Sequence, residues 1–167
     1  ILPYPLIGVI SPWNFPMILA LSDAIPALMA GCAVLNKPAE VTPRFIRPLM
    51  EMARSIPELA GVLSIIEGDG ATGAAMIGHV DYICFTGSVA TGRKVGEAAA
   101  AAFIPASLEL GGKDPMIILA DADPEKAAAI ALRSSIVNSG QACQSIERIY
   151  IAKAIADPFL ESLVRQA

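Results

Sequence analysis

Residues 82–102 read YICFTGSVATGRKVGEAAAAA, and they contain a strand, a turn and a helix in succession. The apolar run 82–85 predicts a buried strand, and the glycine of Thr86-Gly87-Ser88 lets the chain turn into a helix that continues to Ala102. Small or β-branched residues recur on that helix at helical spacing, at Val89, Gly92, Val95, Gly96 and Ala99. Because such a stripe allows close packing on a sheet, the stretch predicts one strand–helix unit of an α/β fold.

Similar strand and helix patterns alternate along the rest of the chain. We expect further strands at residues 6–11, 33–36, 62–66, 106–110, 116–119 and 148–152. We expect helices at 16–30, from a cap at Thr42 onward, at 71–77, at 123–137 and at the end of the chain, the first of them buried. This alternation predicts an α/β fold with a Rossmann-like, mostly parallel sheet and helices on both faces.

Composition and charge argue against several classes of protein. The formal net charge is −4 and no basic stripe occurs, so no nucleic-acid partner is expected. Prolines interrupt the nearly uncharged residues 1–36 before an apolar run reaches the roughly 18 residues of a membrane span. One histidine and no Cys-x-x-Cys pair predict no metal site. Cys32 and Cys84 lie in apolar runs, as small buried residues of a reduced, cytoplasmic protein do.

Two glycine-containing turns are candidate phosphate sites. Residues 68–73 match G-x-G-x-x-G between a predicted strand and helix, but no acidic residue ends the next strand to hold a ribose. Pyrophosphate binding and a simple tight turn therefore both remain open for this motif. At Thr86-Gly87-Ser88 a strand ends and a hydroxyl opens a helix, so either an anion site or an ordinary capped helix fits that turn.

A third unusual stretch, residues 138–145, reads NSGQACQS and places Cys143 among small and polar residues. Cys143 is therefore either an exposed thiol in a polar turn or a nucleophile. The loop lies between a predicted helix and a predicted strand, where it can point a thiol into a cleft. A thiol is mostly protonated at neutral pH, so a nucleophilic role requires a base.

Five separated motifs occur together in this chain. They are Pro12-Trp13-Asn14-Phe15-Pro16, Lys37-Pro38-Ala39-Glu40, Phe85-Thr86-Gly87-Ser88, Glu109-Leu110-Gly111-Gly112-Lys113 and Gly140-Gln141-Ala142-Cys143. In order and spacing they resemble the aldehyde dehydrogenase superfamily, over essentially the whole chain. Members of that family are much longer, so the resemblance implies a fragment. Residues 1–110 would form an incomplete NAD-binding domain, and 111–167 the beginning of a second α/β domain that is catalytic.

The resemblance also implies a catalytic group of three residues. Cys143 would attack an aldehyde, giving a thiohemiacetal and then, after hydride transfer to NAD, a thioester that water hydrolyses. Glu109 would be the general base, because an acid among apolar residues such as Leu108 is well suited to accept a proton. Asn14 would donate a hydrogen bond to the oxyanion. From the sequence alone, an outward-facing strand residue for Glu109 and a turn residue for Asn14 remain alternatives.

For the cofactor, the resemblance implies a binding surface in the first domain. It consists of Ile10, Pro12 and Trp13 along the channel, Lys37 and Glu40 at the adenosine ribose, Gly70 near the adenine, Gly87 and Ser88 at the pyrophosphate, and Leu110 and Gly111 near the nicotinamide. A carboxylate at the ribose favours NAD, with NADP as the alternative. An exposed charge pair before a helix would explain Lys37 and Glu40 without any ligand.

The resulting hypothesis is NAD(P)-dependent oxidation of a small aldehyde to a carboxylic acid, in a full-length protein that is a homo-oligomer. A CoA-acylating semialdehyde dehydrogenase and a non-catalytic NAD-binding protein are the alternatives. Glu109 argues against the first of these, because hydrolysis needs a base for water. The resemblance places the glutamate that holds the nicotinamide ribose beyond residue 167, so the 167-residue chain alone is expected to be inactive.

Overall fold

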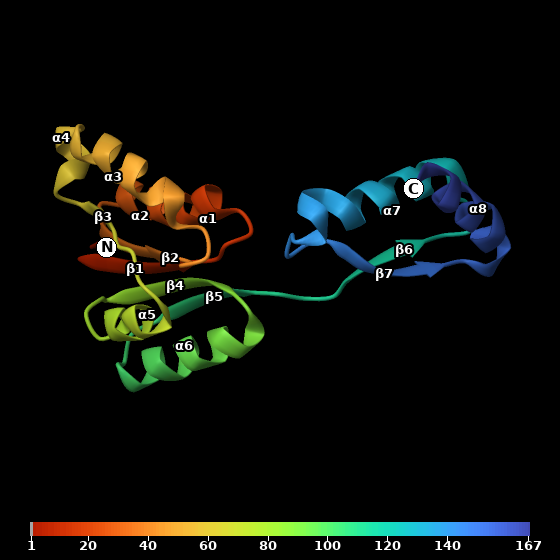
Figure 1. Cartoon of the computed structure of the whole chain (residues 1–167). Helices are drawn as coiled ribbons and strands as arrows, with labels where there is room; N and C mark the ends of the chain where they lie inside the picture. Colours follow the sequence, from red (N-terminus) through yellow and green to blue (C-terminus); the bar gives the residue numbers. More distant parts are fainter. Residues whose placement is uncertain (1) are drawn as a thin grey trace. The chain divides into compact units, whose positions relative to one another are not determined.

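The computed structural model describes residues 2–167, and they form two compact units. One unit runs through Leu110 and the other from Gly111 to Ala167 (Figure 1). The roles assigned to residues 1–110 and 111–167, cofactor binding and catalysis, stay predictions. No helix among residues 2–167 is both long enough and apolar enough to cross a bilayer.

The first unit is built on a five-stranded, entirely parallel sheet. Its strands are β1 (Leu6–Ser11), β2 (Ala33–Pro38), β3 (Leu63–Ile65), β4 (Tyr82–Gly87) and β5 (Ala106–Leu110), in the order β3-β2-β1-β4-β5. The chain moves outward from β1 in one direction and then returns to its other side. The predicted Rossmann-like α/β fold is confirmed.

Helices cover both faces of this sheet (Figure 1). One face carries α1 (Pro16–Ser22), α2 (Ala24–Met29), the 3₁₀ turn η1 (Pro43–Phe45), α3 (Ile46–Arg54) and α4 (Pro57–Ala60). The other carries α5 (Gly70–Ile77) and α6 (Val89–Ala101). Strand alternation explains the two cores, because Ile7 and Val9 of β1 face the first group and Leu6 and Ile10 face the second.

Two helix predictions were wrong in detail. The helix expected at 16–30 is broken at Asp23, since Pro26 has no N–H to donate to Ser22 in a continuous helix. It is also only partly buried, with Met17 and Ile18 exposed. Thr42 lies at the N-cap position with Pro43 after it, as expected, but the element that follows is the 3₁₀ turn η1. The Thr42 hydroxyl makes no capping hydrogen bond and instead donates to the carbonyl of Trp13 at 3.5 Å.

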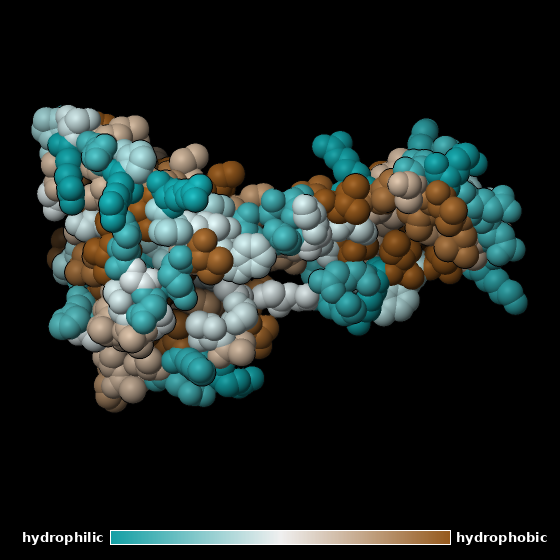
Figure 2. Space-filling view, in the orientation of Figure 1, coloured by the Kyte–Doolittle hydropathy of each residue, from teal (hydrophilic) through white to brown (hydrophobic). Residues whose placement is uncertain are grey.

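The second unit is a small α/β layer. Strands β6 (Asp114–Ile118) and β7 (Ile146–Ile151) pair in parallel, and their core residues pack against α7 (Pro124–Ile136) and α8 (Ala156–Gln166). The short 3₁₀ turns η2 (Val137–Gly140) and η3 (Lys153–Ile155) complete it. Side chains on the uncovered side of the sheet, including Ile117 and Tyr150, are exposed. Figure 2 shows hydrophobic residues in brown at the surface.

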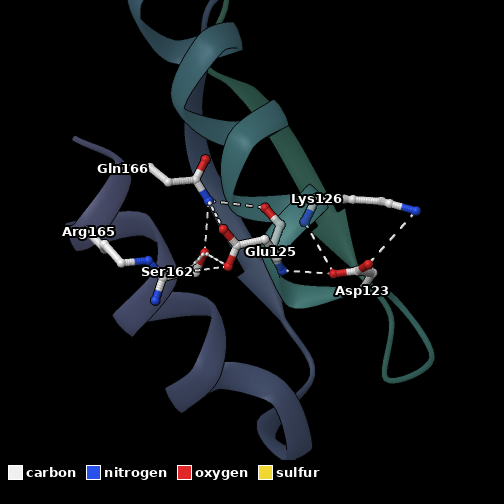
Figure 3. Close-up of polar contacts among 6 residues, drawn as sticks. All are labelled: Asp123, Glu125, Lys126, Ser162, Arg165 and Gln166. Atoms are coloured by element: carbon white, nitrogen blue, oxygen red, sulfur yellow. Dashed lines mark hydrogen bonds and ion pairs between the residues drawn. The ribbon is translucent and has the colours of Figure 1, made fainter.

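Polar contacts join the two helices of this unit (Figure 3). Asp123 caps α7 by accepting from the backbone N–H groups of Glu125 and Lys126. The carboxylate of Glu125 accepts from Ser162 at 2.8 Å and from Arg165 and Gln166 of α8. The hydrogen bonds from Ser162 and Arg165 lower the pKa of Glu125. The start of α7 is therefore held to the end of α8 by a charged acceptor.

Candidate functional site

A pocket of about 540 Å³ lies at the carboxyl ends of β1, β2 and β4 in the first unit. This is the edge at which parallel sheets of α/β proteins bind ligands, and the volume lies within the usual range for small-molecule sites. Its lining residues are Ile10, Ser11, Pro12, Trp13, Lys37, Ala39, Glu40, Gly70, Gly73, Ala74, Ile77, Phe85, Thr86, Gly87, Ser88, Thr91, Lys94, Val95 and Ala98.

The pocket contains all of the predicted cofactor residues except Leu110 and Gly111. Leu110 instead packs beneath α6, where its side chain lies against Gly92. Gly111 is exposed and begins the second unit. Their assignment to the nicotinamide stays a prediction, as does cofactor binding by the other residues.

Lys37 and Glu40 form an ion pair at the pocket wall. Lys37 Nζ lies 3.0 Å from Glu40 Oε2, with the lysine side chain 5% exposed and the glutamate 56%. A hydrogen bond from its own backbone N–H and one from Lys37 hold the pKa of Glu40 below its usual value. Glu40 is therefore an exposed carboxylate at neutral pH, and it can accept hydrogen bonds from hydroxyl groups.

The N-terminus of α6 forms another part of the pocket. Ser88 is the N-cap, and its Oγ accepts from the backbone N–H of Thr91 at 3.2 Å. A Cβ at Gly87 would lie 2.6 Å from the ring of Phe85, so the turn needs a glycine. This end of a 13-residue helix carries a partial positive charge directed at the pocket. The chemistry of these groups fits the pyrophosphate of a dinucleotide.

The G-x-G-x-x-G motif is used differently. Asp69 caps α5, and its carboxylate accepts from the N–H groups of Ala71 and Thr72 at 3.0 and 3.1 Å. These hydrogen bonds lower the pKa of Asp69. A phosphate would need those N–H groups and would be repelled by the carboxylate. The tight-turn interpretation is favoured, while Gly70 and Gly73 still line the pocket wall.

Of the predicted catalytic residues, Asn14 and Glu109 belong to the first unit. Asn14 is half-buried between the end of β1 and the start of α1. Glu109 is exposed, so the expected apolar surroundings were wrong. The physical reason is topological: β5 is an edge strand, and α1 and α2 contact β1 and β2. This leaves alternate β5 side chains, Ser107 and Glu109, uncovered.

Glu109 nevertheless has an acidic neighbour. Burial and, after it, the negative charge of Glu109 raise the pKa of Asp23, the residue at the break between α1 and α2. Cys84 faces the same side of the sheet, and burial together with Asp23 raises its pKa to about 11. Cys84 is half-buried, not fully buried as predicted, whereas Cys32 is buried.

Cys143 lies in the second unit, at the tip of a turn between η2 and β7. The N–H of Ser145 donates to the carbonyl of Ala142 at 3.0 Å, and these two residues are buried anchors of the turn. Cys143 between them is exposed, and its Sγ donates to Gln144 Oε1 at 3.0 Å. The buried residues Ala142 and Ser145 thus fix the two ends of the turn, and the Cys143 thiol between them is exposed to solvent.

The backbone before this turn is unusual. Asn138, Ser139 and Gly140 have φ values of 51°, 59° and 74°, three consecutive residues in the left-handed region. Non-glycine residues adopt such values uncommonly, and they concentrate at functional sites. Because Cys143 and the pair Asn14 and Glu109 belong to separate units, that all three meet in one centre stays a prediction.

Sequence reasoning missed much of the α6 wall of the pocket, including Thr91, Lys94 and Ala98. The spacing of these residues could have indicated them. Residues three and four apart lie on the same face of a helix, so the positions that follow Ser88 at this spacing share the face on which Ser88 lies. The stripe of small residues covers mainly the neighbouring face of α6. Its Gly92, Val95 and Ala99 are buried, Val95 also lines the pocket, and Val89 is 49% exposed.

No group of three or more His, Cys, Asp or Glu side chains within residues 2–167 could hold a metal ion.

Residues 2–167 match the model of the "Aldehyde dehydrogenase family". The chain belongs to the aldehyde dehydrogenase family. It is 44% identical over 158 residues to a Mycolicibacterium smegmatis protein named "Putative succinate-semialdehyde dehydrogenase [NADP(+)]", covering 94% of this chain and 31% of that protein.

Solved structures of aldehyde dehydrogenases are also similar. The "Putative Aldehyde Dehydrogenase PutA" of Anabaena variabilis matches with a TM-score of 0.96 and 56% identity, over 99% of this chain and 35% of that one. The NAD-dependent aldehyde dehydrogenase of Sinorhizobium meliloti matches with a TM-score of 0.93 and 38% identity, over 98% and 33%. The chain thus spans about a third of the length of the aldehyde dehydrogenases that it resembles.

Proposed function

We propose that the full-length protein containing this chain oxidises a small aldehyde to a carboxylic acid with NAD, or with NADP as the alternative. The observation that carries this proposal is the pocket at the carboxyl ends of β1, β2 and β4, in a chain of the aldehyde dehydrogenase family. That pocket brings a carboxylate, a buried lysine and a helix N-terminus to one wall. Related proteins named as NAD-dependent and as NADP-linked support the choice of cofactor.

Within the pocket each group has a defined task. Glu40, held by Lys37, accepts hydrogen bonds from the adenosine ribose hydroxyls. The N-terminus of α6 at Ser88 holds the pyrophosphate, and the apolar walls, with Ile10 and Trp13, shield the dinucleotide from water. When bound, the nicotinamide accepts the hydride that leaves the aldehyde carbon.

The chain's own residues supply the covalent chemistry. The Cys143 thiolate adds to the aldehyde carbonyl to form a thiohemiacetal, whose oxyanion accepts a hydrogen bond from the Asn14 amide. After hydride loss a thioester remains on Cys143. Glu109 takes a proton from water, and the resulting hydroxide displaces the thiolate and releases the carboxylic acid. Glu109 is suited to deliver water because it is exposed rather than enclosed.

The proposal extends to the environment of the protein. Cys32, Cys84 and Cys143 are all free thiols, as in a reducing compartment, and we place the full-length protein in the cytoplasm as a homo-oligomer.

Trapping of the intermediate in the full-length protein tests the reaction. With aldehyde and NAD, mass spectrometry is expected to find an acyl adduct on Cys143, and Cys143→Ala is expected to abolish both adduct and turnover. Glu109→Gln should let the adduct accumulate because hydrolysis slows, while Glu97→Gln, an exposed glutamate on α6, should behave like wild type. Asn14→Ala should lower kcat by about 10²–10³.

Two results would count against the proposal. One is acid formation that persists in Cys143→Ala. The other is product that appears only with coenzyme A, which would favour an acylating enzyme.

A further inference from the structure

Lys94 is the second lysine of the pocket and has no assigned role. It lies on α6, it is exposed, and it lines the same cavity as Glu40 and Ser88. Lys37, the other lysine, is 5% exposed and is neutralised by Glu40 at 3.0 Å. Within residues 2–167 Lys94 makes no ion pair. Its charge thus lies on a residue of the cavity wall, and no ion pair within residues 2–167 compensates it.

The position of Lys94 shows which part of a ligand it could reach. Ser88, Thr91 and Lys94 follow one another at intervals of three along one face of α6. Nearly two helical turns, about 9 Å along the axis, separate Lys94 from the N-terminus at Ser88. Lys94 therefore adds a second cationic group to the pocket, at a backbone position well along the helix from its N-terminus. A ligand that carries two anionic groups could contact both the helix end and Lys94.

A dinucleotide with a phosphate on its adenosine ribose is such a ligand. Its pyrophosphate lies at one position, and its 2′-phosphate lies beyond the ribose. The proposed function assigns the ribose end of the pocket to Glu40, whose carboxylate would repel the 2′-phosphate although Lys37 is paired with it. Lys94 adds an uncompensated positive charge to the same cavity, which offsets that repulsion.

We propose that Lys94 binds the adenosine 2′-phosphate of NADP, so that this pocket accepts NADP as well as NAD. The inference rests on the proposed function, because it assumes that the pocket holds a dinucleotide. It adds a residue that determines cofactor specificity, on a helix face distinct from the ion pair of Lys37 and Glu40. The flexible stem of Lys94 allows its ammonium group to move aside when a ligand without the 2′-phosphate is bound.

Binding of fragments to the 167-residue chain tests the role of Lys94 without any turnover. The probes are 5′-AMP and adenosine 2′,5′-bisphosphate, which differ only in the 2′-phosphate, together with NAD and NADP. Trp13, the one tryptophan of the chain, lines the pocket and is 45% exposed, so quenching of its fluorescence reports binding. Lys94→Met is compared with Arg93→Met, which removes one exposed charge from the same helix at a residue outside the pocket lining.

Lys94→Met is expected to weaken the 2′,5′-bisphosphate and NADP by about threefold to tenfold, as removal of one partly solvated charge pair does. Affinities for 5′-AMP and NAD should change by less than about twofold, and Arg93→Met should leave all four ligands nearly unchanged. Glu40→Gln should strengthen binding of the bisphosphate relative to 5′-AMP, because it removes the opposing charge.

The outcomes separate the inference from the proposed function. Equal effects of Lys94→Met on ligands with and without the 2′-phosphate would overturn the role of Lys94 and leave the cofactor pocket intact. The same conclusion would follow if Arg93→Met weakened the bisphosphate as much as Lys94→Met does. If none of the four ligands quenched Trp13 or bound by calorimetry, the pocket assignment itself would fail, and the inference with it.

Discussion

Single residues in this chain owe their chemistry to what surrounds them, and the three cysteines illustrate this. Cys143 is exposed at the tip of its turn, Cys32 is buried, and Cys84 is half-buried beside Asp23. Burial and Asp23 raise the pKa of Cys84 to about 11, so this thiol stays protonated, and unreactive, until the pH approaches that value.

Iodoacetamide at pH 7.5 is therefore expected to alkylate Cys143 well before Cys84 or Cys32. Peptide mapping by mass spectrometry over a time course measures the order. The rate at Cys84 should rise steeply as the pH is increased toward 11 while the chain remains folded by circular dichroism. Modification of Cys84 ahead of Cys143 at pH 7.5 would contradict this account of the two sites.

Asp69 gives a second prediction at the residue scale. Its carboxylate caps α5 through two backbone N–H groups, and its pKa is lowered in the folded state. A lowered pKa means that the charged cap stabilises the fold above the unfolded pKa of about 3.9, and that this stability is lost as the pH falls through the folded pKa. Asp69→Ala should lower the Tm at pH 7.

Asp69→Asn is the matched control, since asparagine also caps helices and lacks only the charge. Its Tm should lie between those of wild type and Asp69→Ala at pH 7. The gap between wild type and Asp69→Asn should begin to shrink below about pH 4 and should vanish as the pH falls through the lowered folded pKa, where Asp69 also becomes neutral. A gap that does not depend on pH would show that the charge of Asp69 contributes nothing to the cap.

At the scale of secondary-structure elements, the close approach of α6 to the sheet depends on Gly92. A Cβ at this buried position would overlap Leu110 of β5 and lie 3.3 Å from the ring of Phe85. Gly92→Ala is therefore expected to destabilise the first unit by about 1–3 kcal/mol, as overpacking typically does. Urea unfolding followed by Trp13 fluorescence measures the change.

Gly61→Ala is the corresponding control. No atom lies within 4 Å of a Cβ built at Gly61, and its φ of −99° suits any residue. This substitution should leave the stability unchanged or slightly raised, because it reduces the entropy of the unfolded chain. Equal losses from Gly92→Ala and Gly61→Ala would exclude the overlap with Leu110 as the cause.

Some of the secondary-structure elements could be predicted from local sequence, and others could not. Strands such as β1 and β4 were predictable because each is a short apolar run closed by a turn residue, and Asp123 and Ser88 cap helices as expected. The break of the first helix at Asp23 and the exposure of Glu109 were not predictable. The break at Asp23 and the exposure of Glu109 both depend on which strands the helices cover. That coverage follows from the order of the strands in the assembled sheet, which no local stretch of sequence specifies.

In the candidate site, too, some residues could be predicted from local sequence and others depend on the assembled fold. Residues at strand ends, such as Ile10 and Glu40, could be predicted to line the pocket, because parallel strands bring their carboxyl ends together. Lys94 could not be recognised so directly, because its role depends on how α6 is rotated against the sheet. The small and polar neighbours of Cys143 distinguish it in the sequence, but its exposure to solvent depends on the buried residues Ala142 and Ser145 on either side of it.

At the scale of the whole molecule, the chain spans about a third of the length of its relatives and still contains the pocket at the ends of β1, β2 and β4. We therefore expect the purified 167-residue chain to bind NAD but to show no measurable aldehyde oxidation. Calorimetry for binding and absorbance at 340 nm for NADH formation test the two halves of this prediction. Robust turnover by the chain alone would contradict it, and the full-length protein assayed in parallel is the positive control.

Because β1 lies in the middle of the sheet, its backbone amides are expected to exchange slowly with solvent. β1 is hydrogen-bonded to β2 on one side and β4 on the other, and its last residues run directly into Pro12, Trp13 and Asn14. Amide protons of a strand flanked on both sides exchange with solvent only through the largest opening events of a domain. The Cys143 turn, in contrast, lies within the second unit, whose sheet has two paired strands. We therefore expect the pocket wall to be attached to the slowest-exchanging part of its unit, and the amides around Cys143 to exchange faster than those of β1.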